Sequence, residues 1–572
     1  MRGCSFTVAV FVAVLVATRA RVLGDTEYYV SQIVPYLGQA PTGNGNLLWE
    51  FGHLLWRPLG WVLTTVLSPL LSSVTDWTPY MQASFVLISI GVLSGIVTVA
   101  LWYLLIADLA GSDTMASLVA LGFAFSHGFL LYAHSGCAYI PGLAAITGSL
   151  YALRNGRIVW GAVLYALGTL LWFPFILAGA ALLIAAAYRG DWRAAVASSW
   201  KDLDLRRALR FSAVAAVCIV MIYGAALAAR DISSVSEAKA WAADSQHGWV
   251  QSIRFIRIGT GLPRSFLFLG RDGVLYRRFL FHDPYAPVSM ADLVRASLWK
   301  IAVFDVFAFC LLYELLRRPR AANWVSAMLA LAAVPVLIFA VFLFEPGSPE
   351  RYLPALPFLL MAVAWVLRDL RTARRITQWV IVGFLVCVAL NNGYSFFRPL
   401  VSREDQVSSL RVEGFRSHLT NSSVVVVLTI QDPLDEVVNR SPFGSINRPF
   451  PLPIFDAVEG FKASTWRARL AERFQLALTE GGQVWVSKRL WSPRPLPEWY
   501  WVEGEDPQMH WADVPRFARQ LETDADSGGD DGFRRLAQNQ SNRQFLAEVL
   551  ASIPERAARE NEEAITSDDH SQ

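Results

Sequence analysis

Long apolar segments separated by short polar ones fill the first two-thirds of this 572-residue chain. Most are long enough to cross a hydrocarbon core of about 30 Å as a helix. The pattern therefore predicts a polytopic α-helical membrane protein with about eleven spans. The predicted spans are 6–23, 82–107, 114–134, 138–153, 157–171, 172–188, 211–229, 298–316, 322–344, 352–367 and 376–394.

Basic residues predict which side of the membrane each loop faces. If the N-terminus is cytoplasmic, the loops that should be inside carry arginine clusters such as Arg317, Arg318 and Arg320. Loops on the other side are poorer in Lys and Arg near the spans, as the positive-inside rule expects. We therefore expect outer loops at 24–81 and 230–297 and an extracytoplasmic C-terminal region.

The first apolar segment has a second interpretation. Ala17-Thr18-Arg19-Ala20 loosely resembles the small-residue cleavage site of a signal peptide. The weakly charged start of the chain and the arginine just before the cut argue against cleavage. We expect the segment to be retained, and its removal would change the span count by one.

Three regions follow from the pattern. Residues 1–394 form the predicted membrane body, 395–500 read as a small soluble α/β unit, and 501–572 form a charged, partly disordered tail with a helix near 542–561. The elements predicted in the α/β unit are a strand at 424–428, a helix at 462–480 and a strand at 483–487.

Composition excludes several classes of protein. A hydrophobic fraction of 54% and a mean hydropathy of +0.37 are too apolar for an ordinary soluble enzyme. The net charge of +3 is too small for a nucleic-acid-binding surface. The five cysteines all fall in or beside apolar spans, and none forms a close pair with metal-ligand spacing. The sequence therefore predicts no disulfide framework, no metal site and no cofactor.

Two acids stand where the chain leaves the first apolar segment. Charge near lipid costs free energy, so it tends to persist where it does chemistry or binds ions. Asp25 is a candidate general base for an attacking hydroxyl, with Glu27 as a second candidate. Alternatively, Asp25 caps a helix over the following residues and Glu27 interacts with its dipole.

The first outer loop contains a second polar group. Glu50, His53 and Arg57 share one face of a predicted interfacial helix in which Trp49, His53 and Trp56 also recur at helical spacing. An arginine fork suits a phosphate, and its neighbours could orient a substrate hydroxyl. The alternative is that this polar face is simply exposed to water.

The remaining candidates lie in the late outer loop that contains Arg351 and in a short outer loop that contains His134. Arg351 and Tyr352, in the run Pro-Glu-Arg-Tyr-Leu-Pro, place a cation and a phenol at headgroup depth, where they suit a lipid phosphate or serve as an interface anchor. His134 and Tyr139 would face the same cavity as Asp25 if the helices pack around it. The basic loop 230–297 could meet anionic headgroups or a phosphate.

Together these residues resemble the GT-C class of integral-membrane glycosyltransferases. That class includes the dolichyl-phosphate-mannose protein mannosyltransferases and the bacterial transferases that move aminoarabinose onto lipid A. The similarity covers about 1–394: an acidic first outer loop with amphipathic helices, an Arg-Tyr-Leu-Pro entry to a late span at 351–354, and an outside C-terminal domain. The run 53–60 also looks like the His-Pro-x-x-Tyr-Pro-Leu type of segment in related bacterial transferases.

The resemblance implies specific roles. Asp25 matches the first-loop acid, the proposed base or acceptor-positioning residue of the class, and Arg351 with Tyr352 matches the loop that handles the lipid phosphate. Several relatives place Asp and Glu side by side, whereas Thr26 separates them here, which leaves the role of Glu27 open. A metal cluster like that of oligosaccharyltransferases is not visible in the sequence.

The function implied is inverting transfer of a sugar from a polyprenyl-phosphate donor to an acceptor hydroxyl on the extracytoplasmic side. The acceptor could be a lipid, a glycan or a protein, membrane lipids are the other expected partners, and no nucleic acid is expected. The scarcity of Lys and the abundance of Arg and Ala favour a bacterial inner membrane. A transporter or flippase of a lipid-linked or polar substrate is the main alternative, and a non-catalytic assembly protein is a third possibility.

Overall fold

The computed structural model describes most of the chain and divides it into two compact units. One unit comprises Met1–Leu275 with Ser289–Ser402, and the other comprises Tyr276–Val288 with Arg403–Gln572. The residues described are 2–18, 24–38, 47–75, 77, 79–189, 203–244, 258–269, 289–317, 323–343, 347–368, 375–397, 424–427, 450–453, 466–479, 481–487, 517, 519–524 and 533–551.

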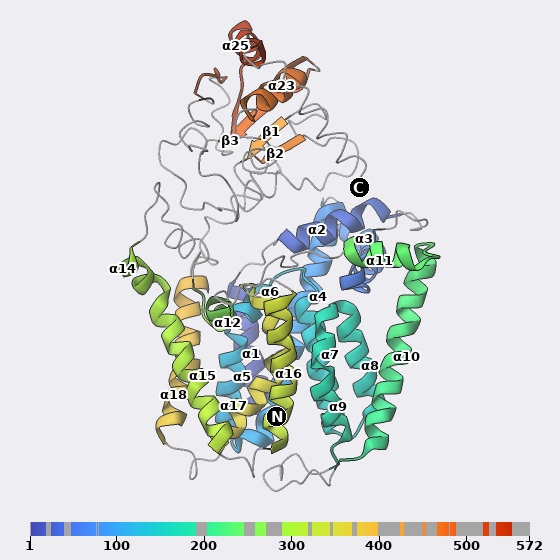
Figure 1. Cartoon of the computed structure of the whole chain (residues 1–572), viewed down its shortest axis with the longest axis vertical. Helices are drawn as coiled ribbons and strands as arrows, with labels where there is room; N and C mark the ends of the chain where they lie inside the picture. The colour runs from blue at the N-terminus through green and yellow to red at the C-terminus, as the bar shows by residue number, and fades with distance from the viewer. Residues whose placement is uncertain are drawn as a thin grey trace. The chain divides into compact units, whose positions relative to one another are not determined.

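The first unit is helical (Figure 1). Its helices begin with α1 (Arg2–Ala17), α2 (Gly24–Ile33), α3 (Trp56–Val74), α4 (Pro79–Ala110), α5 (Asp113–Ala124), α6 (His127–Ala133), α7 (Tyr139–Arg154), α8 (Ile158–Leu171) and α9 (Gly179–Ala187). They continue with α10 (Leu205–Ala229), α11 (Val235–Asp244), α12 (Ile258–Phe266), α14 (Met290–Leu293), α15 (Trp299–Arg317), α16 (Asn323–Phe342), α17 (Leu356–Arg368) and α18 (Arg375–Asn392). Short 3₁₀ turns are η1 (Val34–Tyr36), η2 (Phe51–His53), η3 (Phe173–Ala178) and η8 (Pro349–Ala355), and π-helical turns are η7 (Val294–Leu298) and η9 (Gly393–Phe397).

Within the described residues, six helical stretches are long and apolar enough to cross a membrane, or seven if one bent pair counts as a single span. They are Pro79–Ala107, Leu205–Ala229, Met290–Arg317, Val325–Phe342, Pro349–Arg368 and Arg375–Ser395. This confirms a multi-pass helical membrane protein. The count of about eleven stays a prediction, because several other apolar helices, such as Arg2–Ala17 and Ile158–Leu171, are shorter than this criterion requires.

The span predicted at 114–134 is broken in the middle. Helices α5 and α6 meet at an angle of 70°. Backbone groups freed by such a break need partners inside a membrane, and the Asn392 side chain donates a hydrogen bond to the Phe125 carbonyl at 2.6 Å. The Ser126 hydroxyl donates to the Phe123 carbonyl, also at 2.6 Å. Side chains therefore satisfy two carbonyls at the end of α5, where the bend begins.

Asn392 also holds the end of α12 and the residues that follow it. Its amide nitrogen donates to the Phe266 carbonyl at 2.7 Å, and its amide oxygen accepts from the Phe268 amide at 2.7 Å. The side chain is fully buried. One residue of α18 thus ties together the α5–α6 bend and the segment that follows α12.

Small residues let α7 and α8 approach closely. A Cβ atom on Gly142 would lie 2.4 Å from the Phe175 ring, and one on Gly168 would lie 3.1 Å from the Gly142 carbonyl oxygen. Helix association in lipid depends on such close van der Waals packing, since lipid tails are as apolar as the side chains. This pair fixes α7, which begins with Tyr139.

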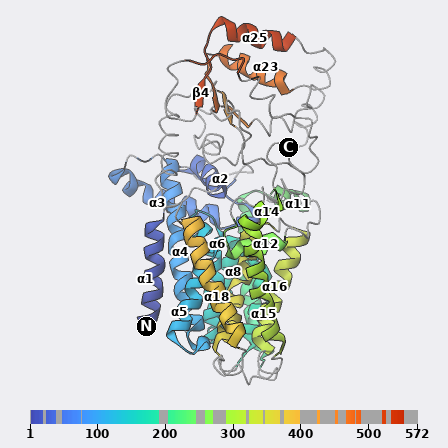
Figure 2. The ribbon, with the colours of Figure 1, turned by 90° about the vertical axis from the view of Figure 1, so that its left-hand side faces the viewer.

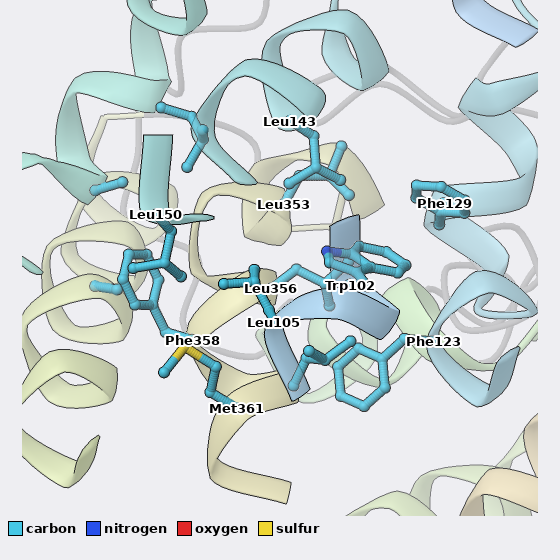
Figure 3. Close-up of a cluster of buried hydrophobic side chains, with 14 of the residues drawn as sticks. Trp102, Leu105, Phe123, Phe129, Leu143, Leu150, Leu353, Leu356, Phe358 and Met361 are labelled. Carbon is cyan, nitrogen blue, oxygen red and sulfur yellow. The ribbon is translucent and has the colours of Figure 1, made fainter. Parts of the chain in front are cut away.

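The core of the unit surrounds α17, whose span is 89% buried. Figure 3 shows Trp102, Phe123, Phe129 and Phe358 converging with aliphatic side chains from several helices. The Trp102 and Phe129 ring centroids are 4.7 Å apart. Because α17 is held on all sides, the turn η8 that leads into it is also held in place.

The first outer loop partly follows its predicted pattern. The helix expected over the residues that follow Asp25 is present as α2 and η1, but the prediction of a single helix over Trp49, His53 and Trp56 is wrong. The Trp49 carbonyl accepts hydrogen bonds from the Trp241 indole at 2.9 Å and Arg230 at 3.0 Å instead of a helical amide. The chain forms η2, and α3 begins only at Trp56.

The second unit contains a four-stranded sheet in the order β2-β1-β3-β4. Its strands are β1 (Val424–Val427), β2 (Phe450–Pro453), β3 (Val484–Ser487) and β4 (Phe533–Arg535), and its described helices are α23 (Trp466–Thr479) and α25 (Gln540–Ala551). β1 runs parallel to β2 and β3, and β4 runs antiparallel to β3. Helix α23 packs on β1 and β3, and α25 packs on α23. Whether these elements make an extracytoplasmic α/β domain stays a prediction.

Replacing Asn392 by alanine should destabilise the helical unit. The Phe125, Phe266 and Phe268 backbone groups would lose buried partners, and leaving a buried polar group unsatisfied costs about 1–3 kcal/mol. We expect a clear fall in the unfolding temperature of the purified protein in detergent. Asn155→Ala is the control, because that exposed side chain donates to the Tyr151 carbonyl of the adjoining helix α7. Equal stability of the two variants would contradict the role assigned to Asn392.

Candidate active site

Asp25 lies in the first turn of α2, next to the start of α7. The helix begins at Gly24, so Asp25 is inside the first turn and not at the capping position considered from the sequence. The Tyr139 hydroxyl donates a hydrogen bond of 2.6 Å to Asp25 Oδ2. Asp25 is exposed, whereas Tyr139 is 4% exposed. A buried phenol therefore holds an accessible carboxylate, an arrangement that leaves one carboxylate oxygen for a substrate.

A second buried phenol links this carboxylate to another. The Tyr132 and Tyr139 ring centroids are 4.7 Å apart with an edge-to-face angle of 82°, a favourable geometry for aromatic pairs. The Tyr132 hydroxyl donates to Glu350 Oε2 at 2.5 Å. Asp25 and Glu350, far apart in the sequence, are thus held by two phenols whose rings pack against each other.

Glu350 in turn faces Arg351. One guanidinium nitrogen of Arg351 lies 3.5 Å from Glu350 Oε1, and both residues are buried. The stiff Pro349–Ala355 turn keeps the two charged side chains together at the entrance of α17. Tyr352, predicted to act beside Arg351, instead packs with Val336 and Ala340 of α16.

Glu50, His53 and Arg57 come together as predicted, although η2 and the first turn of α3 carry them. Arg57 lies 2.6 Å from Glu50 Oε2, and His53 Nδ1 lies 3.4 Å from the same oxygen. His53 Nε2 is 2.9 Å from the Tyr29 hydroxyl. Glu50 and Arg57 are 5% and 2% exposed, so the polar face is buried and the water-exposed alternative is wrong.

Tyr29 joins this cluster to α2. Burial raises its pKa well above the usual value, and the nearby carboxylates Asp25 and Glu50 raise it further. The phenol is therefore protonated at neutral pH and available to donate to His53 Nε2. The His53 and Tyr139 ring centroids are 6.2 Å apart, so the Glu50 cluster adjoins the Asp25 site.

The peptide group of Gly136 anchors the first outer loop. The Trp56 indole donates to the Gly136 carbonyl at 3.0 Å, and the Gly136 amide donates to the Thr26 hydroxyl at 3.0 Å. A side chain at this position would collide with Thr26 Cγ2 at 2.6 Å. Both α2 and α3 are therefore fixed to the α6–α7 loop, which sets the distance between Asp25 and Tyr139.

The remaining predicted residues lie elsewhere or outside the described set. His134 is buried, and its ring nitrogen Nε2 lies 2.6 Å from the hydroxyl of Thr18, the residue that follows α1. The side chain of Glu27 lies outside the described residues. Most basic residues of the loop 230–297 also lie outside them, namely Arg254, Arg257, Arg271, Arg277 and Arg278 with His247 and His282. Among the described residues, no group of three His, Cys, Asp or Glu side chains could hold a metal ion.

Sequence reasoning missed two residues of this arrangement. Tyr132 lies inside a predicted span, where a tyrosine carries no distinguishing pattern. Glu350 stood beside Arg351 in the late outer loop, and an acid next to a candidate phosphate-binding arginine was a usable signal. Only the packed structure pairs Tyr132 with Glu350.

Comparison with known proteins finds similarity only among solved structures. No family model matches the chain, and no curated protein matches it. The structure of an oligosaccharyltransferase from Archaeoglobus fulgidus is similar with a TM-score of 0.46 and 13% identity, covering 94% of this chain and 74% of that one. The structure of ArnT from Cupriavidus metallidurans bound to undecaprenyl phosphate is similar with a TM-score of 0.47 and 13% identity, covering 94% and 98%.

The apo structure of the Cupriavidus metallidurans ArnT gives the same TM-score of 0.47. Each is a protein to which this chain is similar. Any catalytic role in this chain therefore has to be inferred from its own side chains.

Removing the charge of Arg57 should destabilise the first outer loop strongly. Glu50 would stay buried without its cation, which costs about 3–5 kcal/mol. We expect Arg57→Gln to lower the unfolding temperature in detergent, and Arg57→Gln combined with Glu50→Gln to recover much of the loss. Arg157→Gln, which changes an exposed arginine, is the control. If the double variant were less stable than Arg57→Gln alone, the ion pair would not be the source of the effect.

Proposed function

We propose that this protein is a membrane glycosyltransferase that moves a sugar from a polyprenyl-phosphate donor to an acceptor hydroxyl, with inversion at the anomeric carbon. The observation that carries the proposal is the accessible Asp25 carboxylate, held by the buried phenol of Tyr139. A buried Arg351 stands on the other side of the phenol pair. The resemblance of the sequence motifs to GT-C transferases supports the same reading.

Asp25 acts as the general base. The acceptor hydroxyl lies against the carboxylate oxygen that Tyr139 does not occupy, and its proton passes to that oxygen as the acceptor attacks. Tyr139 keeps the carboxylate oriented, so little reorganisation is needed when the proton moves. Glu27, two residues further along the chain, is an auxiliary acid in this scheme.

Arg351 binds the donor phosphate. The acceptor oxygen forms a bond to the anomeric carbon while the bond from that carbon to the phosphate oxygen breaks, and polyprenyl phosphate leaves with the electron pair. The guanidinium neutralises the charge that builds on the leaving oxygen. Glu350, itself held by Tyr132, orients the guanidinium. Arg57 is committed to Glu50 and supports the loop, with Glu50 and His53 lining the acceptor side.

The proposed topology has about eleven spans, a cytoplasmic N-terminus and an extracytoplasmic α/β domain after residue 394. The membrane would be a bacterial inner membrane, and the acceptor a lipid, glycan or protein. A transporter is not favoured, because transporter sites lie near the midplane among broken helices. Here Asp25 belongs to α2, outside the spans, and Glu350 and Arg351 begin the span Pro349–Arg368.

Replacing Asp25 by asparagine should abolish most transfer. The amide keeps an acceptor for the Tyr139 hydroxyl but cannot take a proton, and loss of a general base lowers rates by about 10²–10⁴-fold. The assay is transfer of radiolabelled sugar from polyprenyl phosphate to a membrane lipid extract by the purified protein. Asp231→Asn is the matched control, since Asp231 lies in an exposed turn with φ +53°, a conformation that asparagine also tolerates.

Two results would count against this assignment. Transfer by Asp25→Asn at a rate similar to Asp231→Asn would remove Asp25 as the base. No transfer or hydrolysis by the unaltered protein with a broad panel of donors would favour the transporter.

Replacing Tyr139 by phenylalanine should lower turnover and leave donor binding intact. A hydrogen bond to a charged group contributes about 1.5–3 kcal/mol, so we expect kcat to fall about 10–100-fold with an unchanged KM for the donor. Tyr165→Phe is the control, because that largely buried phenol donates to the Ile176 carbonyl at 3.1 Å, away from Asp25. Equal kcat values for the two variants would show that Tyr139 does not position the base.

A further inference from the structure

A groove of about 630 Å³ lies between α15 and α18, apart from the Asp25 site. Figures 1 and 2 show these two helices side by side at the edge of the helical unit. The groove is lined by cationic residues, by aromatic residues and by the apolar face of α18. None of its lining residues belongs to the groups around Asp25, Glu50 or Glu350.

Both walls of the groove change their helical geometry at the same end. The chain leading into α15 forms the π-helical turn Val294–Leu298, and the chain leaving α18 forms the π-helical turn Gly393–Phe397. Arg295 stands on the first turn, and Tyr394 and Ser395 stand on the second. Single π turns inside helices are rare and are frequent at functional sites. Two that frame one groove indicate a built site and not a packing defect.

The inner part of the groove is apolar and open. A Cβ atom on Gly383 would meet no atom within 4 Å, so the glycine leaves space along α18. Val386 and Leu390, one and two turns further along, are 43% and 68% exposed. This strip suits a hydrocarbon chain that lies against the helix from the surrounding lipid.

The end with the π turns is cationic and polar. The Arg295 side chain is 80% exposed, and its guanidinium lies 3.9 Å from the Asp292 carboxylate. Lys300 Nζ donates to the Phe268 carbonyl at 2.9 Å, and the Asn391 amide donates to the same carbonyl at 3.2 Å. Trp299 lies beside this end and is 42% exposed. Such a mixture of cations and an aromatic residue is typical of headgroup depth.

We propose that this groove binds an anionic bilayer phospholipid, with one acyl chain along Gly383 and the phosphate against Arg295 and Lys300. The positive charges of Arg295 and Lys300 favour an anionic headgroup. The apolar strip along α18 suits an acyl chain, which favours a lipid over a soluble phosphate. A bulk phospholipid is the chosen occupant because the groove opens toward lipid-exposed side chains and shares no residue with the proposed transfer site. This inference does not depend on the proposed function.

Hydrogen bonds connect the cationic end of the groove to the segment after α12. The Phe268 carbonyl accepts the hydrogen bond of Lys300, and the Phe268 amide is held by Asn392. Three residues earlier, the Ser265 hydroxyl donates to the Pro349 carbonyl at 3.1 Å, at the start of the turn that carries Glu350 and Arg351.

The test measures lipid retention by the full-length protein. Purified protein is exchanged into detergent, titrated with phosphatidylglycerol or phosphatidylcholine of identical acyl chains, and bound lipid is counted by native mass spectrometry alongside the unfolding temperature. Arg295→Gln should weaken phosphatidylglycerol binding about fivefold, because each basic residue near an anionic lipid contributes about 1 kcal/mol to binding. Gly383→Trp, which fills open space, should weaken retention of both lipids. Arg210→Gln, at an exposed position of α10, is the control and should bind like the unaltered protein.

Three outcomes would overturn the proposal. Equal retention of the two phospholipids would show that the groove does not prefer an anionic headgroup. Unchanged binding by both Arg295→Gln and Gly383→Trp would show that the bound lipid lies elsewhere. Displacement of phosphatidylglycerol by equimolar polyprenyl phosphate, lost in Gly383→Trp, would identify the groove as a site for the isoprenoid lipid. Since sugar transfer is not measured, failure here leaves the proposed function to its own assay.

Discussion

The arrangement depends on the edge-to-face contact between the rings of Tyr132 and Tyr139. Each phenol is buried and donates its hydroxyl proton to a different carboxylate, one on the first outer loop and one at the entrance of α17. Buried hydroxyls need partners, so each ring position dictates where its carboxylate must lie. The packed pair of rings therefore brings Asp25 and Glu350, which are far apart in the sequence, to the same site.

The membrane environment explains why so much polar structure supports this pair. A backbone or charged group inside lipid must be satisfied by protein, and the chain does so with side chains at each irregular point. Asn392 supplies partners at the α5–α6 bend, and Trp56 and Thr26 hold both polar atoms of the Gly136 peptide. These contacts stabilise the breaks in regular structure and at the same time fix the loops that carry the acids.

The sequence predicted the elements better than their contacts. Apolar periodicity located most helices, because long apolar runs have few alternatives in lipid, but it missed the bend at Phe125 that Asn392 stabilises. The candidates Asp25 and Tyr139 were found because polar residues at span ends stand out against an apolar chain. Tyr132 could not be found, since a tyrosine within a span looks like a packing residue until its partner is placed. Tyr352 was assigned to the site from adjacency to Arg351; its ring packs on α16, and its role in binding a substrate stays a prediction.

The central claim is that the two phenols bring both carboxylates to one site, and an experimental structure of the protein in a lipid disc tests it most directly. We expect the Tyr139 oxygen within hydrogen-bonding distance of Asp25 and the Tyr132 oxygen within hydrogen-bonding distance of Glu350, with the two rings in contact. Packed helices between the two tyrosine–carboxylate pairs, or an Asp25 that opens to the opposite side of the membrane from Arg351, would contradict the account.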